Sequence, residues 1–369
     1  GSDLGPKLVY ESLAAYRQSC RCHFLSYHDE QGCQNILRQL DPATTLVVIV
    51  SKSFRTEETM RLAEYTKKWM SSAAGNFDNA HSHFIGISAN TDKVNAFGIP
   101  NEQCLPIWDW VGGRFSIWSA VGFSAALAVG MDTFYDFLLG ARKMDQHFRQ
   151  APISQNMPII LALLAVWYNN FFHAKSRAII PYSPELHHLP QYLQQAHMES
   201  LGKSVNQDGE KIHYSTGPIV WGGNGFSSQH SFNQLFLQGK QLAPIDFILP
   251  LSKAHLSWKQ NQHRIANCLA QSKALMLGEF TKTNHQEIPG NIPSNTILMQ
   301  TLSPQTLGAL LALYEHKIYA QSVLWNINAF DQWGVEHGKR IAQQILSDLS
   351  TEQIHQKHDA STKGLLETV

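Results

Sequence analysis

Several features that would narrow the function of this chain are missing from its 369 residues. The 29 Lys and Arg residues balance the 29 Asp and Glu residues, so no excess charge of one sign indicates a nucleic-acid or membrane partner. A compact anion needs only a local cluster of donors, and it is not excluded by neutrality. No low-complexity tract and no short-period repeat occurs, which excludes a repeat architecture.

Cysteines are few and long apolar runs are missing. The five cysteines are an odd number, and their spacings match neither a zinc ribbon nor a zinc finger. A reduced, cytoplasmic protein without a metal site is therefore predicted. The longest apolar run, Met157–Trp167, is too short to span a bilayer, and Pro158 suits the first turn of a helix. We interpret this run as a buried helix.

The pattern of apolar segments predicts an α/β protein with mostly parallel sheets, because strands and helices alternate along the chain. The length favours two or three domains, and a boundary is expected near Gly130. The β-branched run at 44–50 is interpreted as a buried central strand. The other expected elements are strands at 83–88, 178–180, 217–221, 246–250 and 296–301, and helices at 56–70 and 116–131.

The stretch Asn326–Arg340 predicts a helix with a polar stripe. From about residue 331 on, a helix places Gln332, Glu336 and Lys339 on one side, at positions i, i+4 and i+7. Such a stripe presents an amide, a carboxylate and an ammonium group together. Taken alone, a Lys–Glu pair three residues apart is more often a solvated surface pair.

Two glycines, Gly334 and Gly338, fall on the opposite side of the same predicted helix. Each costs about 1 kcal/mol in a helix interior, so they predict a neighbouring backbone packed close against that side. This glycine face favours a half-buried helix over a solvated one. The flanking aromatic residues favour it too: Trp325, Phe330 and Trp333.

A second unusual motif, Asp109–Gly122, reads Asp-Trp-Val-Gly-Gly-Arg-Phe-Ser-Ile-Trp-Ser-Ala-Val-Gly. Gly112 and Gly113 precede Arg114, and they suit either the close approach of a ligand or a tight turn. A permanently charged guanidinium at this point is able to stabilise an oxyanion. The alternative is a structural arginine that binds loop carbonyls.

A hydroxyl-rich segment, Ser51–Thr59, follows the predicted strand at 44–50. A strand-to-helix turn presents free backbone N–H groups, and the N-terminus of the helix favours an anion. The hydroxyl side chains add neutral donors. No P-loop pattern is present, and an ordinary Ser/Thr-rich helix cap is the alternative to a phosphate cradle.

Two further residues are candidates for acid–base chemistry. Glu199 follows Gln195 by one helical turn, and Gly202 predicts a helix end just after it. A carboxylate there opposes the helix dipole, which raises its pKa toward a useful range, although a surface glutamate is the alternative. His230 follows the turn at 222–225 and is predicted to open an amphipathic helix, where an imidazole stays neutral.

The two long motifs resemble signatures of glucose-6-phosphate isomerases, occur in that family's order, and are joined by further matches over nearly the whole chain. The resemblance implies two sugar-isomerase-type three-layer α/β/α sandwiches, which we place at 1–130 and 131–345. After about Leu346 the chain becomes polar and charged, so we expect residues 346–369 to form a helical tail that wraps a partner. It implies an aldose–ketose isomerase that interconverts D-glucose 6-phosphate and D-fructose 6-phosphate in glycolysis and gluconeogenesis. It also implies a cytoplasmic homodimer that uses no cofactor and no metal.

The resemblance also implies roles for individual residues. Glu199 moves the proton, Arg114 stabilises the enediolate, and Lys339 opens the sugar ring together with His230, which reaches the site from the partner subunit. The neighbours Ala196 and His197, and the segment 226–229, depart from the family pattern. The residues implied to bind substrate or phosphate are Ser2, Ser51, Lys52, Ser53, Thr56, Thr59, Gly113, Gln195 and Gln332.

The first residues, Gly1–Pro6, read as the family's Gly-Ser-Asp-Leu-Gly-Pro loop. Because that loop follows a strand in the family, we expect the chain to lack an N-terminal part, including the first strand. A second interpretation is a non-catalytic sugar-phosphate sensor, which needs the hydroxyl cradle but not the four catalytic candidates. A third is an isomerase of relaxed specificity that also accepts mannose 6-phosphate.

Overall fold

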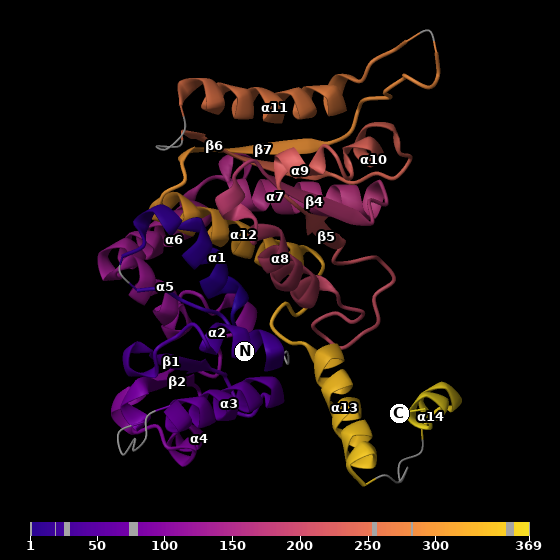
Figure 1. The fold of residues 1–369 in the computed structure, drawn as a ribbon. Helices are drawn as coiled ribbons and strands as arrows, with labels where there is room; N and C mark the ends of the chain where they lie inside the picture. The colour runs from indigo at the N-terminus through magenta and orange to yellow at the C-terminus, as the bar shows by residue number, and fades with distance from the viewer. Residues whose placement is uncertain are drawn as a thin grey trace.

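The computed structural model describes residues 2–18, 20–25, 30–73, 80–252, 257–281, 283–351 and 358–368. Two parallel sheets organise the chain, one built from residues 47–106 and one from residues 176–301 (Figure 1). Gly1 of the predicted N-terminal loop lies outside the described residues, and α1 (Leu4–Ser12) begins within that loop.

The first sheet has three parallel strands, β1 (Val47–Val50), β2 (Phe84–Ser88) and β3 (Cys104–Pro106), in that spatial order. The helices α3 (Glu57–Ala73) and α4 (Thr91–Phe97) pack on it through apolar side chains. The predicted strand at 83–88 and the helix at 56–70 are confirmed. The interpretation of 44–50 as a central strand is wrong, because β1 stands at an edge of this three-stranded sheet and pairs with β2.

The second sheet has four parallel strands in the order β5-β4-β6-β7. Helix α11 (Trp258–Leu277) covers one face, and α12 (Pro304–Leu324) lies on the other side (Figure 1). The inner strands are almost fully buried, which explains their continuous apolar sequence. All four predicted strands are present: β4 (Ser176–Pro181), β5 (Ile219–Gly222), β6 (Ile245–Ser252) and β7 (Ser294–Thr301).

A bundle of helices joins the two sheets around the largest apolar core of the described chain. Helix α6 (Met131–Gln150) crosses α12 at very short distance, because glycines stand at the crossing. A Cβ atom built on Gly308 would lie 1.9 Å from the carbonyl oxygen of Phe137, and one on Gly140 would lie 1.9 Å from that of Gln305. The other helices of this region are α1, α5 (Phe123–Val129), α7 (Met157–Val166) and α8 (Leu189–Gln194).

The predicted helix at 116–131 is only partly present, because residues 123–129 form α5 but residues 116–122 belong to a compact loop. Two 3-10 turns, Gly113–Phe115 and Ala120–Gly122, precede the short helix α5. The side chain of Ser119 accepts a hydrogen bond from the backbone N–H of Val121, which stabilises the second turn. The first half of the prediction is wrong because side-chain capping of this kind competes with a continuous helix.

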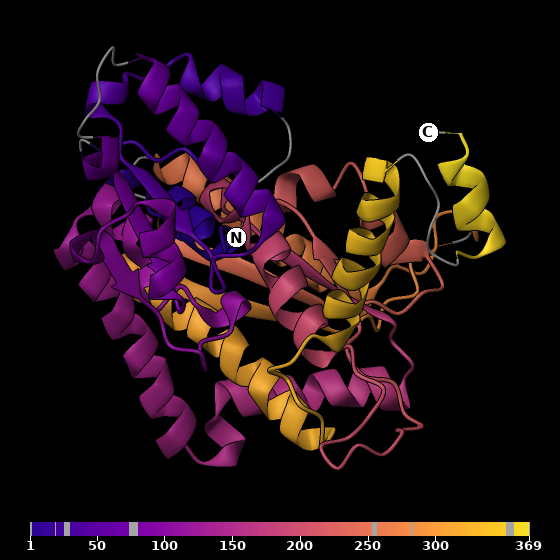
Figure 2. The ribbon, with the colours of Figure 1, turned by 90° about the horizontal axis from the view of Figure 1, so that it is seen from below.

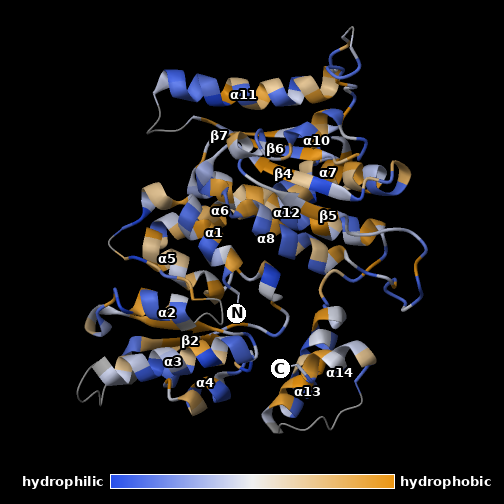
Figure 3. Ribbon diagram, turned by 45° about the vertical axis from the view of Figure 1, so that its right-hand side comes forward, coloured by the Kyte–Doolittle hydropathy of each residue, from blue (hydrophilic) through white to orange (hydrophobic). Residues whose placement is uncertain are grey.

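Helix α13 (Trp333–Thr351) carries the C-terminal motif and extends away from the rest of the molecule, with α14 (Ala360–Leu366) beside it (Figures 1 and 2). A Cβ atom built on Gly334 or Gly338 would meet no atom of the described residues within 4 Å. The predicted close packing of a backbone against these glycines is therefore wrong. Several apolar side chains of α13 are exposed instead, and orange positions recur along the helix in Figure 3.

The shorter helices are α2 (Glu30–Leu37), α9 (Gly225–Ser228) and α10 (Asn233–Gln238). The predicted buried helix at 157–167 is present as α7, although Met157 and Leu163 are exposed. Among the helices that the structure describes, none combines the length and apolar character needed to cross a membrane.

Candidate active site

Arg114 is a buried arginine that ties three separate chain segments together. Its side chain lies in the loop of 3-10 turns, and the residue is 5% exposed. Its Nε donates to Oγ of Ser200 at 2.7 Å, and its Nη2 donates to the carbonyl oxygens of Ala329 at 2.6 Å and Asp331 at 3.2 Å. These bonds hold the guanidinium in one orientation.

The remaining nitrogen of Arg114 faces two predicted site residues. Nη1 lies 3.2 Å from Oε1 of Glu199 and donates to Oε1 of Gln332 at 3.3 Å. Burial lowers the pKa of the guanidinium from its ordinary value, and the charges of Glu199 and Asp331 act in the opposite direction. The structure thus brings together Arg114, Glu199 and Gln332, which lie far apart in the sequence. Arg114 also binds loop carbonyls, so the structural role that was its alternative is present as well.

Glu199 stands at the end of a widened helical turn. Helix α8 continues directly into the π-helical turn Gln195–Glu199, and the helix ends just before Gly202, as predicted. The side chain of Glu199 is 20% exposed and paired with Arg114, so it is not a free surface glutamate. Gln195, at the start of the turn, is exposed. π-Helical turns occur often at functional sites because they re-aim side chains.

The hydroxyl-rich segment forms the turn between β1 and α3. Ser51 is buried, and its Oγ shares a hydrogen bond of 3.2 Å with Oγ1 of Thr56. Lys52 donates from Nζ to the carbonyl oxygen of Asp109, which joins this turn to the arginine motif. Ser53 is exposed, and Thr59 lies partly exposed in the first turn of α3. The geometry of a helix N-terminus with hydroxyl donors is therefore present.

Ser2 lies beside the arginine motif. A Cβ atom built on Gly113 would lie 3.1 Å from Oγ of Ser2, so the missing side chain lets the N-terminal segment approach. Gly113 also opens a 3-10 turn. The tight turn is thus the geometry seen here, and it places Ser2 next to the residue that precedes Arg114.

Two predicted catalytic residues lie outside this arrangement. His230 is exposed in the turn between α9 and α10, so the prediction that it opens a helix is wrong. The backbone N–H of His230 donates to the carbonyl oxygen of Ser227 at 3.2 Å, and this bond closes the turn before α10 begins. Lys339 extends from α13 and pairs with Glu336 at 3.1 Å, with both side chains about half exposed. For Lys339 the structure shows the solvated surface pair that the glycine pattern argued against.

Ser200, Lys203 and Asp331 complete the surroundings of the ion pair, and sequence reasoning assigned them no role. Nζ of Lys203 lies 2.7 Å from Oδ1 of Asp331 and fixes the segment whose carbonyl binds Arg114. Ser200 and Lys203 lie within four residues of Glu199, but no known spacing pattern predicts that they contact Arg114 or Asp331.

A buried charge cluster lies behind the π-helical turn, and it too was missed. Arg177 of β4 donates two hydrogen bonds to Asp246 of β6, at 2.9 and 2.6 Å, and Lys317 of α12 lies 3.6 Å from the same carboxylate. Burial acts to raise the pKa of Asp246, but Arg177 and Lys317 together hold it far below its usual value. Burial lowers the pKa of His197, which stays neutral beside this cluster. The one sequence feature that pointed to this cluster was Asp246, an acidic residue inside the apolar strand β6.

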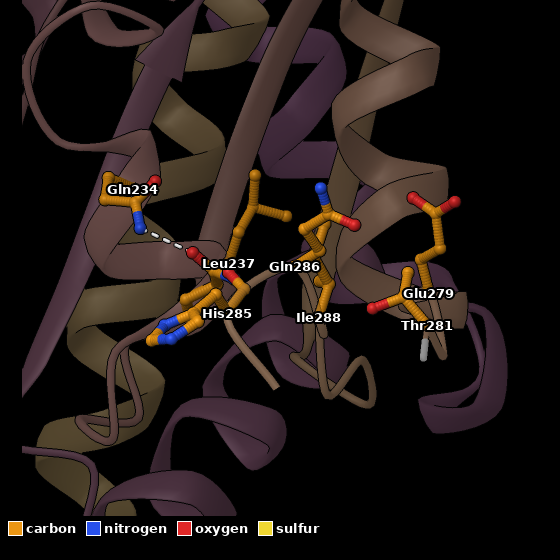
Figure 4. A pocket seen from close by; sticks show the side chains of 8 residues that line it. Gln234, Leu237, Glu279, Thr281, His285, Gln286 and Ile288 are labelled. Atoms are coloured by element: carbon orange, nitrogen blue, oxygen red, sulfur yellow. Dashed lines mark hydrogen bonds between the residues drawn. The ribbon is translucent and has the colours of Figure 1, made fainter. Parts of the chain in front are cut away.

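A separate open cavity of about 410 Å³ lies between α10 and residues that follow α11 (Figure 4). No predicted site residue lines it. Gln234 donates a hydrogen bond of 2.6 Å to Gln238 across part of its wall. Its other lining residues are Leu237, Glu279, Thr281, His285, Gln286 and Ile288. In the described part of the chain, no group of three or more His, Cys, Asp or Glu side chains is arranged to hold a metal ion.

Residues 1–366 match the family model of phosphoglucose isomerase, essentially the whole chain. The chain belongs to the phosphoglucose isomerase family. It is 49% identical to a glucose-6-phosphate isomerase of Coxiella burnetii over 389 aligned residues, covering 100% of this chain and 71% of that protein. It is 47% identical to a glucose-6-phosphate isomerase of Pseudomonas fluorescens, covering 99% of this chain and 70% of that protein.

Solved structures place the chain in the same family by shape. A glucose-6-phosphate isomerase from Chlamydia trachomatis superposes with a TM-score of 0.88 at 35% identity, covering 100% of this chain and 70% of that one. A hypothetical protein from Thermus thermophilus superposes with a TM-score of 0.76 at 27% identity, covering 94% of this chain and 81% of that one. The predicted fold class and the family resemblance are confirmed.

Proposed function

We propose that this member of the phosphoglucose isomerase family interconverts D-glucose 6-phosphate and D-fructose 6-phosphate. The observation that carries the proposal is the 3.2 Å contact between buried Arg114 and Glu199. The family resemblance of the sequence motifs implies catalytic roles for both residues. Relatives that are 47–49% identical to the chain are named glucose-6-phosphate isomerase. A sensor module would need neither member of this pair.

Glu199 serves as the base that carries a proton between C1 and C2 of the open sugar. Removing that proton leaves negative charge on the neighbouring oxygen of the enediolate. Arg114 lies beside the base, and its other nitrogens are held by Ser200 and by carbonyl groups, so its orientation costs no reorganisation during the reaction. The same carboxylate returns the proton to the adjacent carbon while the hydroxyl proton passes from O2 to O1, so no proton is gained or lost overall.

The turn between β1 and α3 holds the phosphate group. Two observations support this phosphate site. Thr56 and the buried Ser51 share a hydrogen bond between their hydroxyl groups, and the N-terminus of α3, which follows them, favours anions. Gln332, which accepts a hydrogen bond from Arg114, is a further residue that we propose to bind the phosphate group. The remaining substrate contacts that we propose are Lys52, Ser53, Thr59, Ser2, Gly113 and Gln195.

Ring opening requires a further proton donor and acceptor, and we assign these roles to His230 and Lys339. Both side chains are exposed, so in the described chain neither is sequestered by a structural role. We propose a cytoplasmic homodimer in which His230 completes the site of the partner subunit. Lys339 has to exchange its contact with Glu336 for one near the Arg114–Glu199 pair. We also retain the division into domains at 1–130 and 131–345 with a tail at 346–369.

A coupled assay for conversion of fructose 6-phosphate to glucose 6-phosphate tests the proposal. We expect Glu199→Gln to reduce turnover by about 10²–10⁴-fold, the usual contribution of a positioned base, while a sugar phosphate still binds. Glu102→Gln, on the exposed surface, is the matched control and should leave turnover unchanged. Binding without turnover in the unaltered chain would instead favour the sensor, and full activity of Glu199→Gln would exclude this base.

A further inference from the structure

Glu315 of α12 accepts two hydrogen bonds that the mechanism above does not use. Its Oε1 accepts from the hydroxyl group of Tyr192 at 2.6 Å, and its Oε2 accepts from Nε1 of Trp118 at 2.7 Å. The residue is partly buried, and both donors come from other parts of the chain. A carboxylate that binds one donor with each oxygen fixes the distance between the two donors.

The two donors belong to the two segments that carry the proposed catalytic pair. Tyr192 lies in α8, three residues before the π-helical turn that ends at Glu199. Trp118 lies four residues after Arg114, in the same loop of 3-10 turns. Glu315 is thus a single side chain bonded to both segments, at a point close in sequence to each reacting group.

We propose that Glu315 is a positioning residue of the isomerase, which sets how Arg114 meets Glu199 by holding Trp118 and Tyr192 at once. The inference rests on the proposed function, because it concerns the same pair. Among the described residues, Glu315 shares no hydrogen bond or ion pair with either member of the pair. It acts through the backbone of the two segments and not on the substrate.

The frame around Glu315 is rigid enough for this role. The indole ring of Trp118 stacks on Phe137 of α6, with ring centres 4.8 Å apart and planes 13° apart. Tyr192 is almost fully buried in the main core. Helix α12 itself is held against α6 by the close contact at Gly308. A change at Glu315 is therefore transmitted to the two donors and is not absorbed by loose neighbours.

Glu315 also lines a cavity of about 600 Å³ that lies beside the catalytic pair. Phe115, next to Arg114, and Phe330, next to Asp331, line the same cavity and contact each other edge to face. Tyr192 is almost fully buried, so little water competes for its hydrogen bond to Glu315. The charged or titratable side chains that line the cavity with Glu315 are Arg142, Asp145 and Arg149 of α6 and His316 and Tyr319 of α12.

The environment has a measurable effect on the carboxyl group. Burial raises the pKa of Glu315 to about 7, the hydrogen bonds from Tyr192 and Trp118 oppose this rise, and Asp145 adds to it. An amide is thus a fair substitute for the group near neutral pH. In Glu315→Gln the amide oxygen accepts from Trp118, and the amide nitrogen donates to the oxygen of Tyr192, so both contacts persist.

The test compares Glu315→Leu with Glu315→Gln in the isomerase assay. A displacement of about 1 Å at a reacting group costs about a hundredfold, so we expect kcat of Glu315→Leu to fall by that order. Its KM should stay within about twofold, because phosphate binding at the β1–α3 turn is untouched. Glu315→Gln should recover most of the lost kcat, a rescue that a role in substrate charge stabilisation does not predict.

Tyr314→Phe provides the matched control. Tyr314 is the neighbour of Glu315 in α12, is buried, and donates a hydrogen bond of 3.3 Å to Asp246 instead of to a site segment. We expect this variant to be less stable but to keep its kcat. An equal fall of kcat in Tyr314→Phe would show that loss of stability alone explains the effect, and it would overturn the inference.

Should Glu315→Leu fail to fold, Trp118→Phe and Tyr192→Phe each remove one of the two bonds and replace the test. Each should lower kcat without raising KM. Unchanged kcat in these variants, or in a folded Glu315→Leu, would refute the positioning role alone. Absence of turnover in the unaltered chain would refute the proposed function and, with it, this inference.

Discussion

A single added methyl group at Gly308 should force α6 and α12 apart. The Cβ atom of alanine would lie 1.9 Å from the carbonyl oxygen of Phe137 and 3.0 Å from the backbone nitrogen of Ala141. Real Cβ atoms do not approach closer than 3.0 Å, so the backbones have to separate by about 1 Å. The obstacle is main chain, which cannot turn aside as a flexible side chain does.

The expected loss of stability follows from this geometry. Overpacking a tight interior costs roughly 1–3 kcal/mol, and a backbone contact places Gly308→Ala at the upper end. The better helix propensity of alanine offsets about 1 kcal/mol. A net decrease of about 2 kcal/mol in the free energy of unfolding is therefore expected, and denaturant titration followed by far-UV circular dichroism measures it.

Gly338→Ala is the control for this experiment. The same methyl group on α13 would lie more than 4 Å from every atom that the structure describes around it, so only helix propensity changes, and no loss of stability is expected. If Gly308→Ala proved as stable as the unaltered chain, the two helices could not approach each other as closely as described.

Two further predictions concern buried charges. Because the folded-state pKa of Glu315 is raised from 4.5 to about 7, its contribution to stability declines as pH rises through that interval, and a glutamine is free of this decline. The free energy of unfolding of Glu315→Gln, relative to that of the unaltered chain, should thus increase by at most about 3 kcal/mol between about pH 5 and pH 8. Denaturant midpoints measured across this pH range test the expectation. An opposite trend would contradict the raised pKa of Glu315. Asp246→Asn leaves Arg177 and Lys317 uncompensated and should cost about 3–5 kcal/mol, whereas a loss below about 1 kcal/mol would mean that the cluster does not stabilise the second sheet.

Motifs and local periodicity accounted for a large part of the fold. The strands of the second sheet were located because apolar β-branched runs are typical of buried parallel strands. The helix at 56–70 and the end of the helix after Glu199 followed from periodicity and from Gly202. These features depend on neighbours in the chain, which a sequence displays directly.

Other features depended on contacts between distant residues. The loop around Arg114 is a pair of 3-10 turns because hydroxyl capping and bonds to residues more than 200 positions away outweigh helix propensity. Likewise, the glycines of α13 have the helical spacing expected for packing, yet no described element covers them. A spacing shows which residues share a face but not whether anything lies against that face.

The sequence by itself determined the family, the α/β class and the identity of Arg114 and Glu199 as candidates, because these rest on residue types in contiguous motifs. Only the tertiary structure decided that these two side chains meet at 3.2 Å, that Ser200 and Asp331 hold Arg114, and that Glu315 is bonded to the segments of both residues. The physical reason is that burial and hydrogen-bond partners arise from the packing of separate helices, strands and loops. The order of residues along the chain does not give the distances between these elements.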